Sequence, residues 1–349
     1  MRKGLHIIGV MVLGLVLCAG AQNPGKRYTV AFYNLENLFD TIKSPGVNDE
    51  EFTPEGAKNW NSQKYGKKMS NIEEVFYKLS ADTRAYPAVI GVSEIENRNV
   101  LEDIVALPKL QKANYQIVHY DSPDKRGVDV ALLYRPSQFR LEGSAALPVK
   151  LADNPDWKTR DVLMVWGTIE DEPFYFFVNH WPSRLGGQQQ SEYLRELAAG
   201  VVRHAVDSVV AARPDAKIVI MGDLNDDPTD RSIAVTLGAR AKMSEAKGAA
   251  DLFNPFNEMH RKGFGTLAYQ DAMNLFDNMI VNGNLVTGGS GKLKLHKPDT
   301  NRFYGNIYDR PFLRQQSGQY KNYPLRTFVG NNFQGGYSDH FPVFLYIAK

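Results

Sequence analysis

Two short motifs carry the side chains best suited to chemistry. One is Gly-Asp-Leu-Asn at residues 222–225, which follows an apolar run at 218–221. The other is Ser-Asp-His at residues 338–340, which precedes an apolar run at 341–347. An aspartate beside a histidine at the end of a strand can supply a metal ligand and a proton-transfer group at one place. The two motifs therefore predict metal-assisted hydrolysis.

Further oxygen-bearing side chains end apolar runs elsewhere in the chain. Asn34 and Glu94 are of this kind, and with Asp223, Asn225 and Asp339 they form a set of carboxylates and amides. Such ligands suit Mg²⁺, and also Mn²⁺ or Ca²⁺, whereas a tetrahedral zinc site prefers thiolates and histidines. A single strand-end glutamate is more often a solvated group, so only the whole set indicates a site.

A histidine, an arginine and two glycines lie close together in the sequence. His180 alone could be a packing residue, but Arg184 offers a planar fork for phosphate oxygens. Gly186 and Gly187 allow the backbone to approach a ligand closely. A cationic group that faces a metal ion stabilises a phosphoryl group during transfer. We therefore expect this segment to contact phosphate.

Asp277 precedes a strand-like run at 278–281 and is weak evidence on its own. Its expected role is to accept a hydrogen bond from His340 and so to fix the tautomer of that imidazole. The segment from Asp223 to Asn225 could be no more than an Asx turn. Both interpretations can hold together, because a turn would keep the two side chains rigid.

Alternating strands and helices must position these residues. Short β-branched or aromatic runs predict strands at 28–33, 88–92, 128–134, 162–169, 174–178, 218–221 and 278–281, with a hairpin around 171–173. Apolar residues at helical spacing predict helices within 71–79 and 191–210. This pattern favours an α/β sandwich with mixed sheets.

No linker or repeat divides the chain, and the candidate site residues run from Asn34 to His340. We therefore expect a single domain over residues 22–349. Residues 40–66 and 292–327 lack regular periodicity and are expected to be long surface insertions.

The first 21 residues have the features of a secretory signal peptide. Two basic residues are followed by an apolar run at 7–17, which is too short to span a bilayer, and by Ala-Gly-Ala at 19–21. Cleavage after Ala21 would export the protein to the periplasm or the medium. No membrane span would then remain in the mature chain.

Cleavage at that position would also remove Cys18, the only cysteine, and with it any disulfide or thiolate metal site. The alternatives are an uncleaved anchor and a lipoprotein modified at Cys18. Leu17 argues against lipidation, because a small residue normally stands at that position.

The mature chain would carry no excess charge. Without Arg2 and Lys3 it has 39 basic and 39 acidic residues, so no global positive field marks a nucleic-acid-binding protein. The segment Lys292–Arg326 is the exception, with eight Lys or Arg residues against two acidic residues, interleaved with six Phe or Tyr residues. Such interleaving suits nucleic acid, although the aromatic residues could equally pack the segment down.

The order and local context of these residues resemble the endonuclease/exonuclease/phosphatase superfamily, the fold of DNase I-like nucleases and sphingomyelinases. The resemblance covers about residues 27–348 and is strong at Tyr-Asn-Leu-Glu-Asn (33–37), Ser-Glu (93–94), Asn-His (179–180) and the two opening motifs. The longer phrases at 179–184 and 335–342 look like a secreted bacterial branch. The resemblance implies a four-layer sandwich of two mixed β-sheets flanked by helices, with the site at one edge.

The resemblance also implies which residues bind the metal and the phosphate. Asn34, Glu94 and Asp339 would hold a divalent metal, and His180 would stabilise the phosphate. Some members place a Tyr or Glu between Glu94 and His180 to contact phosphate. No single match exists here, and Arg126 or Asp129 is the candidate.

The remaining residues would handle the water and its proton. Asp223 and Asn225 would position or activate the water, and Asp277 would orient His340. Whether Asp223 or His340 is the base stays open.

We expect an exported, divalent-metal-dependent phosphodiesterase that hydrolyses DNA or RNA and needs no stable protein partner. A lipid phosphodiesterase or a small-molecule phosphatase on the same fold is the alternative. A lipid enzyme should carry an exposed apolar hairpin near the site, and the sequence shows no clear one. A non-catalytic binding protein is disfavoured, because the polar set is intact.

Overall fold

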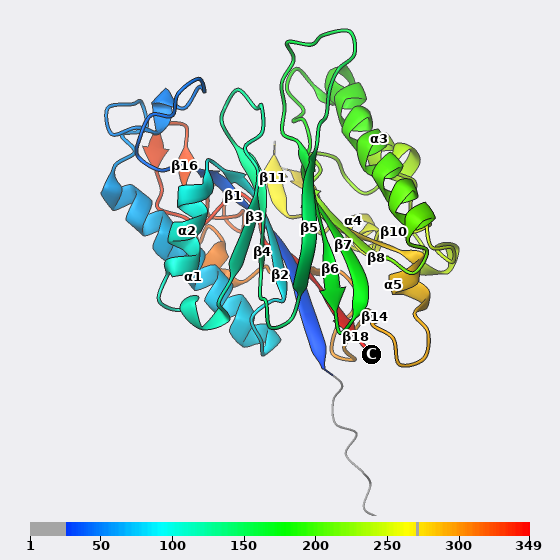
Figure 1. Ribbon diagram of the computed structural model, residues 1–349. Helices are drawn as coiled ribbons and strands as arrows, with labels where there is room; N and C mark the ends of the chain where they lie inside the picture. The colour runs from blue at the N-terminus through cyan, green and yellow to red at the C-terminus, as the bar shows by residue number, and fades with distance from the viewer. Residues whose placement is uncertain (1–25, 270–271) are drawn as a thin grey trace, which may run out of the picture.

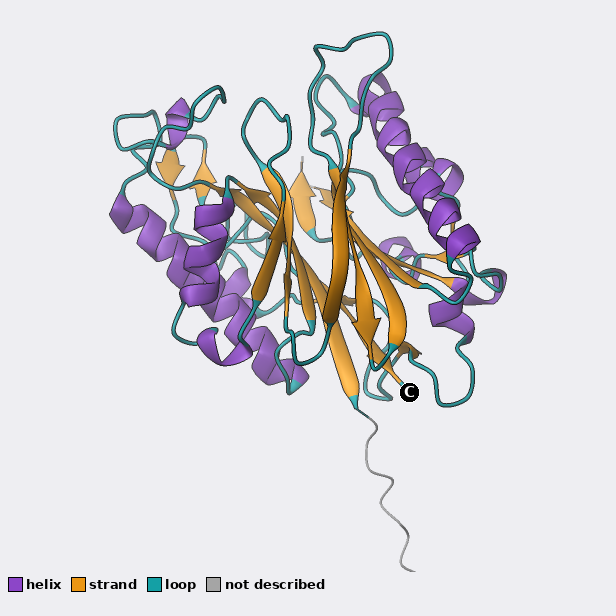
Figure 2. Cartoon of the chain, in the orientation of Figure 1, coloured by secondary structure: helices purple, strands orange, loops and turns teal. Residues whose placement is uncertain are grey.

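Two β-sheets packed face to face form the centre of the computed structural model, which describes residues 26–269 and 272–349 (Figure 1). Helices cover the outer faces, so the chain forms the expected four-layer α/β sandwich (Figure 2). The predicted signal peptide lies outside the described residues. Within them, no helix is long and apolar enough to cross a membrane.

The first sheet joins the two ends of the chain. Its strand order is β14-β18-β1-β2-β4-β3, and β15 also pairs with β18. β1 runs antiparallel to β18 and parallel to β2. The strands are β1 (Arg27–Leu38), β2 (Val89–Ile95), β3 (Gln116–His119), β4 (Asp129–Tyr134), β14 (Lys294–His296), β15 (Asn306–Ile307) and β18 (Val343–Ala348).

The second sheet has the order β5-β6-β7-β8-β13-β10-β9. The predicted hairpin is confirmed, since β6 and β7 pair antiparallel across Glu170 and Asp171, which both have positive φ. The strands are β5 (Arg140–Leu147), β6 (Val162–Ile169), β7 (Glu172–His180), β8 (Lys217–Asp223), β9 (Ala239–Arg240), β10 (Leu252–Phe253) and β13 (Asp277–Asn282).

Helices α1 (Ser62–Thr83) and α2 (Arg98–Ala106) cover the first sheet, and α3 (Gln188–Ala212) covers the second. The predicted helices lie inside α1 and α3, but both begin earlier than expected. The side chain of Asn61 caps α1 by accepting from Lys64 N, which adds a polar first turn without apolar periodicity.

Several shorter elements complete the fold. The helices are α4 (Asn257–Arg261) and α5 (Gly283–Thr287), with 3₁₀ turns at Glu50–Phe52, Gln111–Ala113, Met243–Glu245 and Pro311–Leu313 and a π turn at Ser232–Thr236. The two small hairpins are β11 (Leu267–Tyr269) with β12 (Ala272–Asn274), and β16 (Phe328–Val329) with β17 (Asn332–Phe333).

The two predicted insertions lie largely at the surface, as expected, but each is anchored in the core by a few buried residues. Within residues 40–66, Phe52 and Trp60 are buried against Phe328. Within residues 292–327, β14 and β15 pair with β18, and Tyr308 is buried. The sequence pattern missed these anchors because the apolar residues are irregularly spaced and their partners lie far away along the chain.

Candidate active site

The site residues lie where the ends of the two sheets meet. In the second sheet, Asp223 at the end of β8 is in register with His180 on β7 and with Asp277 on β13. Gly222 allows this close packing, since a Cβ there would lie 2.3 Å from the carbonyl oxygen of Asn179. Three of the predicted residues therefore occupy one row across three adjacent strands.

The first sheet presents its residues through irregular backbone. The register of β1 against β2 breaks just after Asn34, and the register of β2 against β4 breaks around Glu94. Glu36, Asn37 and Glu94 have φ angles of 49°, 49° and 57°, in the left-handed region that non-glycine residues rarely adopt. Asn37 N then donates to Glu94 Oε2 at 2.8 Å. The irregularity turns these side chains toward the end of the sheet.

An aspartate holds the histidine of the Ser-Asp-His motif. His340 Nδ1 lies 2.7 Å from Oδ2 of the fully buried Asp277, and His340 Nε2 lies 3.7 Å from Asp223 Oδ2. Burial opposes the charge on His340, but Asp277 and Asp223 outweigh it and raise the pKa of the imidazole well above its usual value. With Nδ1–H donated to Asp277, Nε2 faces Asp223.

Asp223 is poised to exchange a proton near neutral pH. Burial raises its pKa to about 7, against the opposing charge of His340. Asn34 Nδ2 donates to its Oδ2 at 3.0 Å, and Asn225 N donates to its Oδ1 at 3.0 Å. The expected Asx turn is therefore present, and it fixes the Asp223 carboxylate. The side chain of Asn225 donates to the carbonyl oxygen of Trp181.

His180 lies between Glu94 of the first sheet and Asp223 of the second. Its Nε2 lies 3.6 Å from Glu94 Oε1 and 3.8 Å from Asp223 Oδ2. Its Nδ1 is buried and has no hydrogen-bond partner among the described residues. Burial, reinforced by the charge of Arg160, lowers the pKa of His180 well below its usual value. A neutral imidazole that donates through Nε2 fits these surroundings.

One acidic residue of the site was not predicted. Glu36 is buried, and burial together with Asp339 raises its pKa to about 7. Its Oε2 accepts from Thr327 N at 2.6 Å and lies 4.0 Å from the ammonium of the buried Lys68. The spacing of two from Asn34 was the available signal, because alternate residues of a strand share a face.

Comparison with known proteins places the chain in a family. The model of the Endonuclease/Exonuclease/phosphatase family matches residues 29–349. The chain belongs to this family. No curated protein sequence matches it.

Solved structures share the fold at low sequence identity. Truncated TDP2 from Caenorhabditis elegans aligns with a TM-score of 0.55 and 15% identity, covering 93% of this chain and 98% of that one. The catalytic domain of human Nocturnin aligns at 0.50 and 12%, covering 92% and 94%. A Bacteroides thetaiotaomicron mannosyl-6-phosphatase aligns at 0.52 and 15%, covering 92% and 100%.

Enzymes of the Endonuclease/Exonuclease/phosphatase family are generally metal-dependent, and the residues here fit a cation. The charges of Glu36, Glu94 and Asp339 all act on the same two basic groups, Lys68 and Arg326. The Arg326 guanidinium spans two of them, with Nη2 2.6 Å from Asp339 Oδ2 and Nε 3.9 Å from Glu36 Oε1. Burial raises the pKa of Glu36, so a further positive charge beside it would stabilise its ionised form. A divalent ion would supply that charge.

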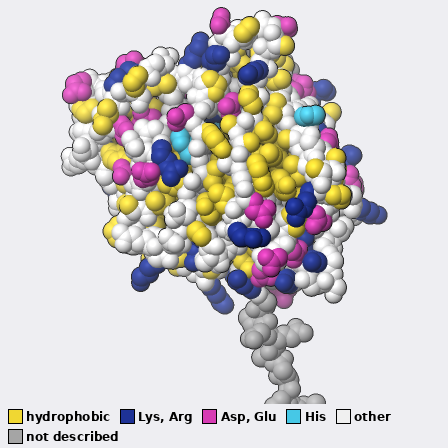
Figure 3. All heavy atoms as spheres, in the orientation of Figure 1, with side chains coloured by type: hydrophobic (Ala, Val, Ile, Leu, Met, Phe, Trp, Pro, Cys, Tyr) yellow, Lys and Arg dark blue, Asp and Glu magenta, His cyan; other side chains and the backbone are white. Residues whose placement is uncertain are grey.

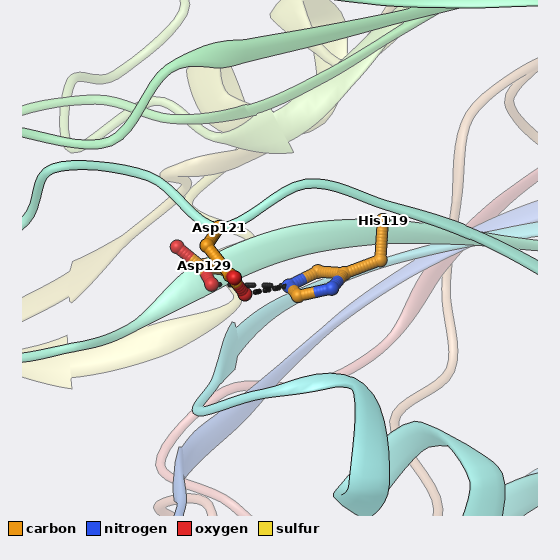
Figure 4. Close-up of side chains that lie close together, drawn as sticks. All are labelled: His119, Asp121 and Asp129. Atoms are coloured by element: carbon orange, nitrogen blue, oxygen red, sulfur yellow. Dashed lines mark hydrogen bonds and ion pairs between the residues drawn. The ribbon is translucent and has the colours of Figure 1, made fainter. Parts of the chain in front are cut away.

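A second acidic group lies outside this centre. His119, Asp121 and Asp129 bring their ligand atoms within 4.8 Å of one another and could also hold a metal ion (Figure 4). Asp129 Oδ2 already lies 3.0 Å from His119 Nε2, and its Oδ1 accepts from Ser122 N. Both carboxylate oxygens of Asp129 are thus paired, with His119 and with Ser122, rather than free for the phosphate contact considered for this residue. Arg126 is the better placed alternative, since its Nη2 lies 3.7 Å from Glu94 Oε2.

The structure pairs Arg184, which was expected to contact phosphate, with aspartates of the loop that follows Asp223. Its Nη2 lies 2.7 Å from Asp230 Oδ2 and 3.2 Å from Asp226 Oδ1, and its Nε donates to the carbonyl oxygen of Asn225. Its guanidinium carbon also lies 4.3 Å from the centroid of the Phe276 ring. The side chain forms ion pairs with aspartates that lie later in the chain. Arg184 therefore fixes the loop after Asp223 rather than facing a ligand.

The lysines expected to grip nucleic acid lie far from the centre. Lys294 pairs with Ala348 at the far end of β18, whereas His340 precedes the start of that strand. Only the end of the basic segment reaches the site, through Arg326. Figure 3 shows Lys and Arg side chains interspersed with Asp and Glu on one face of the molecule. Attraction to an anionic substrate therefore has to be local.

Proposed function

We propose that this protein is an exported, divalent-metal-dependent phosphodiesterase and that its substrate is nucleic acid. The observation that carries the proposal is the buried row Asp277–His340–Asp223, which lies beside the carboxylates of Glu94 and Asp339. A histidine held by one aspartate can fix a second carboxylate, which then orients a water and accepts its proton. The adjoining carboxylates provide the metal ligands that phosphoryl transfer needs.

In this proposal Asp223 is the base and His340 carries the charge. An imidazolium kept protonated by Asp277 cannot accept a proton, whereas a carboxylate with a pKa of about 7 can. Asn34 and Asn225 hold that carboxylate in place. His180 would donate Nε2–H to a phosphate oxygen and stabilise the charge that develops there.

The metal site completes the arrangement. Asn34, Glu94 and Asp339 would hold a divalent ion, with Glu36 as a further ligand. When bound, the ion would polarise the phosphate and stabilise its negative charge. Arg326 would then exchange its contact with Asp339 for a substrate phosphate, which a guanidinium binds through its planar fork.

Two rim arginines favour a substrate with more than one phosphate. Arg126 stands beside Glu94 and Arg326 beside Asp339, and both side chains are nearly half exposed. Such a pair suits successive phosphates of a nucleic-acid backbone. A structure of zebrafish (D. rerio) TDP2 with a single-stranded DNA product, which shares 12% identity and a TM-score of 0.54, is consistent with this choice.

The proposal is tested with purified protein and five substrates: single-stranded DNA, duplex DNA, RNA, sphingomyelin and mannose 6-phosphate. Each is assayed with Mg²⁺, Mn²⁺, Ca²⁺ or EDTA. We expect cleavage of nucleic acid that requires a divalent ion. Cleavage that persists in EDTA would show that the reaction does not require a divalent metal ion. Turnover of only the lipid would indicate a lipid phosphodiesterase, and turnover of only the sugar phosphate would indicate a small-molecule phosphatase.

A further inference from the structure

A hollow of about 340 Å³ opens beside Asp339 and Arg326. Its walls come from β11, the loop 315–326 and the β16–β17 hairpin. We name it the tyrosine pocket, after the lining residues Tyr269, Tyr320 and Tyr323. Because Asp339 belongs to the metal-ligand set, the pocket adjoins the position of the reacting phosphate.

Aromatic side chains dominate the tyrosine pocket. The rings of Tyr320 and Tyr323 have centroids 5.9 Å apart and planes inclined by 39°. Tyr269 and Tyr320 are 59% and 47% exposed, and the neighbouring Val329 is 40% exposed. Large apolar groups that gather in one exposed hollow mark a ligand site more than a core.

The polar groups of the pocket are neutral. The side-chain amides of Gln315 and Gln319 make no hydrogen bond within the described residues, and the amide of Gln334 donates to the carbonyl oxygen of Asn332. Among the described lining residues, only Arg326 and Asp339 are charged, and both stand at the border with the metal-ligand carboxylates. The interior therefore suits an uncharged ring with hydrogen-bonding edges.

The pocket is fixed relative to the site. Leu325 N donates to Leu313 O, and Tyr337 N donates to Leu325 O, each at 2.7 Å. Gly336 lies so close to this loop that a Cβ would stand 2.1 Å from Leu325 O. The pocket wall is therefore packed against the segment that leads into Asp339, and its distance from the catalytic groups is set by the fold.

We propose that the tyrosine pocket binds the base of the nucleotide next to the phosphate that is cleaved. This inference rests on the proposed function, hydrolysis of nucleic acid. Tyrosine rings stack on any base, and glutamine amides hydrogen-bond to base edges. A pocket of this volume is at the lower end of those that hold single small molecules, so it takes one base and not a base pair. The enzyme therefore acts on unpaired nucleotides.

Binding without turnover tests the pocket directly. Titration calorimetry in EDTA compares deoxyadenosine 5′-monophosphate with deoxyribose 5-phosphate, which lacks the base. We expect the nucleotide to bind the wild-type protein about 10-fold more tightly, and Tyr320→Leu to remove most of that difference. Tyr193→Leu is the matched control, because Tyr193 is an exposed tyrosine on α3. Equal affinity of the wild type for both ligands would overturn the proposal.

Kinetics separates this inference from the proposed function. With Mg²⁺, single-stranded DNA should be cleaved at least about 10-fold faster than duplex DNA, and Gln319→Leu should change the order of preference among the four bases. If DNA is cleaved but Tyr320→Leu keeps the wild-type KM, the pocket is wrongly assigned and the proposed function stands. If the wild type cleaves neither DNA nor RNA, the proposed function itself is wrong.

Discussion

The two sheets supply different chemistry to one site, and they do so by different structural means. The second sheet places His180, Asp223 and Asp277 at regular positions of adjacent strands. The first sheet places Glu36 and Glu94 through left-handed residues at breaks in strand register. In the proposed roles, the proton-transfer groups of the second sheet thus come from regular structure, whereas the metal-ligand candidates Glu36 and Glu94 come from strained structure.

The charge balance also differs between the two sheets. The carboxylates of the first sheet face Lys68, a buried ammonium whose pKa is lowered by burial, and Arg326, a nearly half-exposed guanidinium. Those of the second sheet face His340, whose charge depends on them. In the proposed function, the carboxylates of the first sheet (the first group) would bind the metal ion, and Asp223 and Asp277 of the second sheet (the second group) would keep His340 charged.

The largest effect is expected from breaking the first group at Glu94. Glu94→Gln keeps the size of the side chain and removes its charge, so kcat/KM with Mg²⁺ should fall by at least about 10³-fold. Glu142→Gln on β5 is the control, because it changes the same group on a partly exposed edge strand. Circular dichroism should be the same for both variants and the wild type. Retention of activity in Glu94→Gln would remove this residue from the metal site.

The second group should be sensitive to the orientation of His340. Asp277→Asn should lower kcat by about 10²- to 10³-fold with little change in KM, because it disturbs the imidazole rather than substrate binding. The double variant Asp277→Asn, His340→Ala should be no worse than His340→Ala alone. If the losses in kcat of the two single variants multiply in the double variant, the two residues do not act as one unit.

A smaller effect is expected from Arg184, which supports the loop that follows Asp223. Arg184→Ala should lower kcat about 10-fold and lower Tm by about 5 °C, because Asp230 loses a partly buried cation, Asp226 keeps only Arg195, and the loop after Asp223 loosens. Arg126→Ala is the comparison and should mainly raise KM. A raised KM with unchanged Tm in Arg184→Ala would restore its predicted contact with phosphate.

The charge balance of the first group should appear in the pH dependence of stability. The pKa of Glu36 is about 7 in the folded protein and near its ordinary value of 4.5 in the unfolded chain. Between these values the folded state holds a proton that the unfolded state has lost, so the free energy of unfolding falls as pH rises.

Glu36→Gln keeps the acceptor for Thr327 N and removes this ionisation. Its free energy of unfolding in EDTA should therefore fall less from pH 4.5 to pH 7, by at least about 1 kcal/mol relative to wild type. Urea unfolding at several pH values measures the difference, with the exposed Glu55→Gln as control. Parallel curves for wild type and Glu36→Gln would contradict it.

The smallest effect is expected far from both groups. Replacing Lys292, Lys294 and Lys297 with Ala should leave the KM for DNA within about 2-fold and the salt dependence unchanged, since this part of the basic segment lies toward the far end of β18. Arg326→Ala should instead reduce the slope of log K against log salt by about 1. A reduced slope in the lysine variant would show that the substrate does contact these three lysines.

The sequence predicted the second group better than the first. His180, Asp223 and Asp277 follow or precede regular apolar runs, so strand prediction alone brings them to one sheet edge. Glu36 was missed although it stands two residues after Asn34, because a break in strand register decides where its side chain points. The layered fold and its mixed sheets were predicted, and they are confirmed.

The differences from expectation share one physical cause, which is long-range contact. Arg184 was assigned to phosphate for its planar guanidinium, but its partners Asp226 and Asp230 lie more than 40 positions away along the chain. The lysines were assigned to the substrate for their interleaving with aromatic residues, but the pairing of β14 with β18 is invisible in either segment alone. Local patterns predict elements, whereas these assignments depended on which elements meet.

The pairing of β1 with β18 determines when the candidate site can form during synthesis and folding of the chain. Asn34 lies on the first strand and His340 directly precedes the last, so the catalytic groups meet only after the final residues have paired with the first ones. Closing so long a loop is a slow step in folding. A chain that is still being synthesised therefore lacks Asp339 and His340, and its candidate site is incomplete.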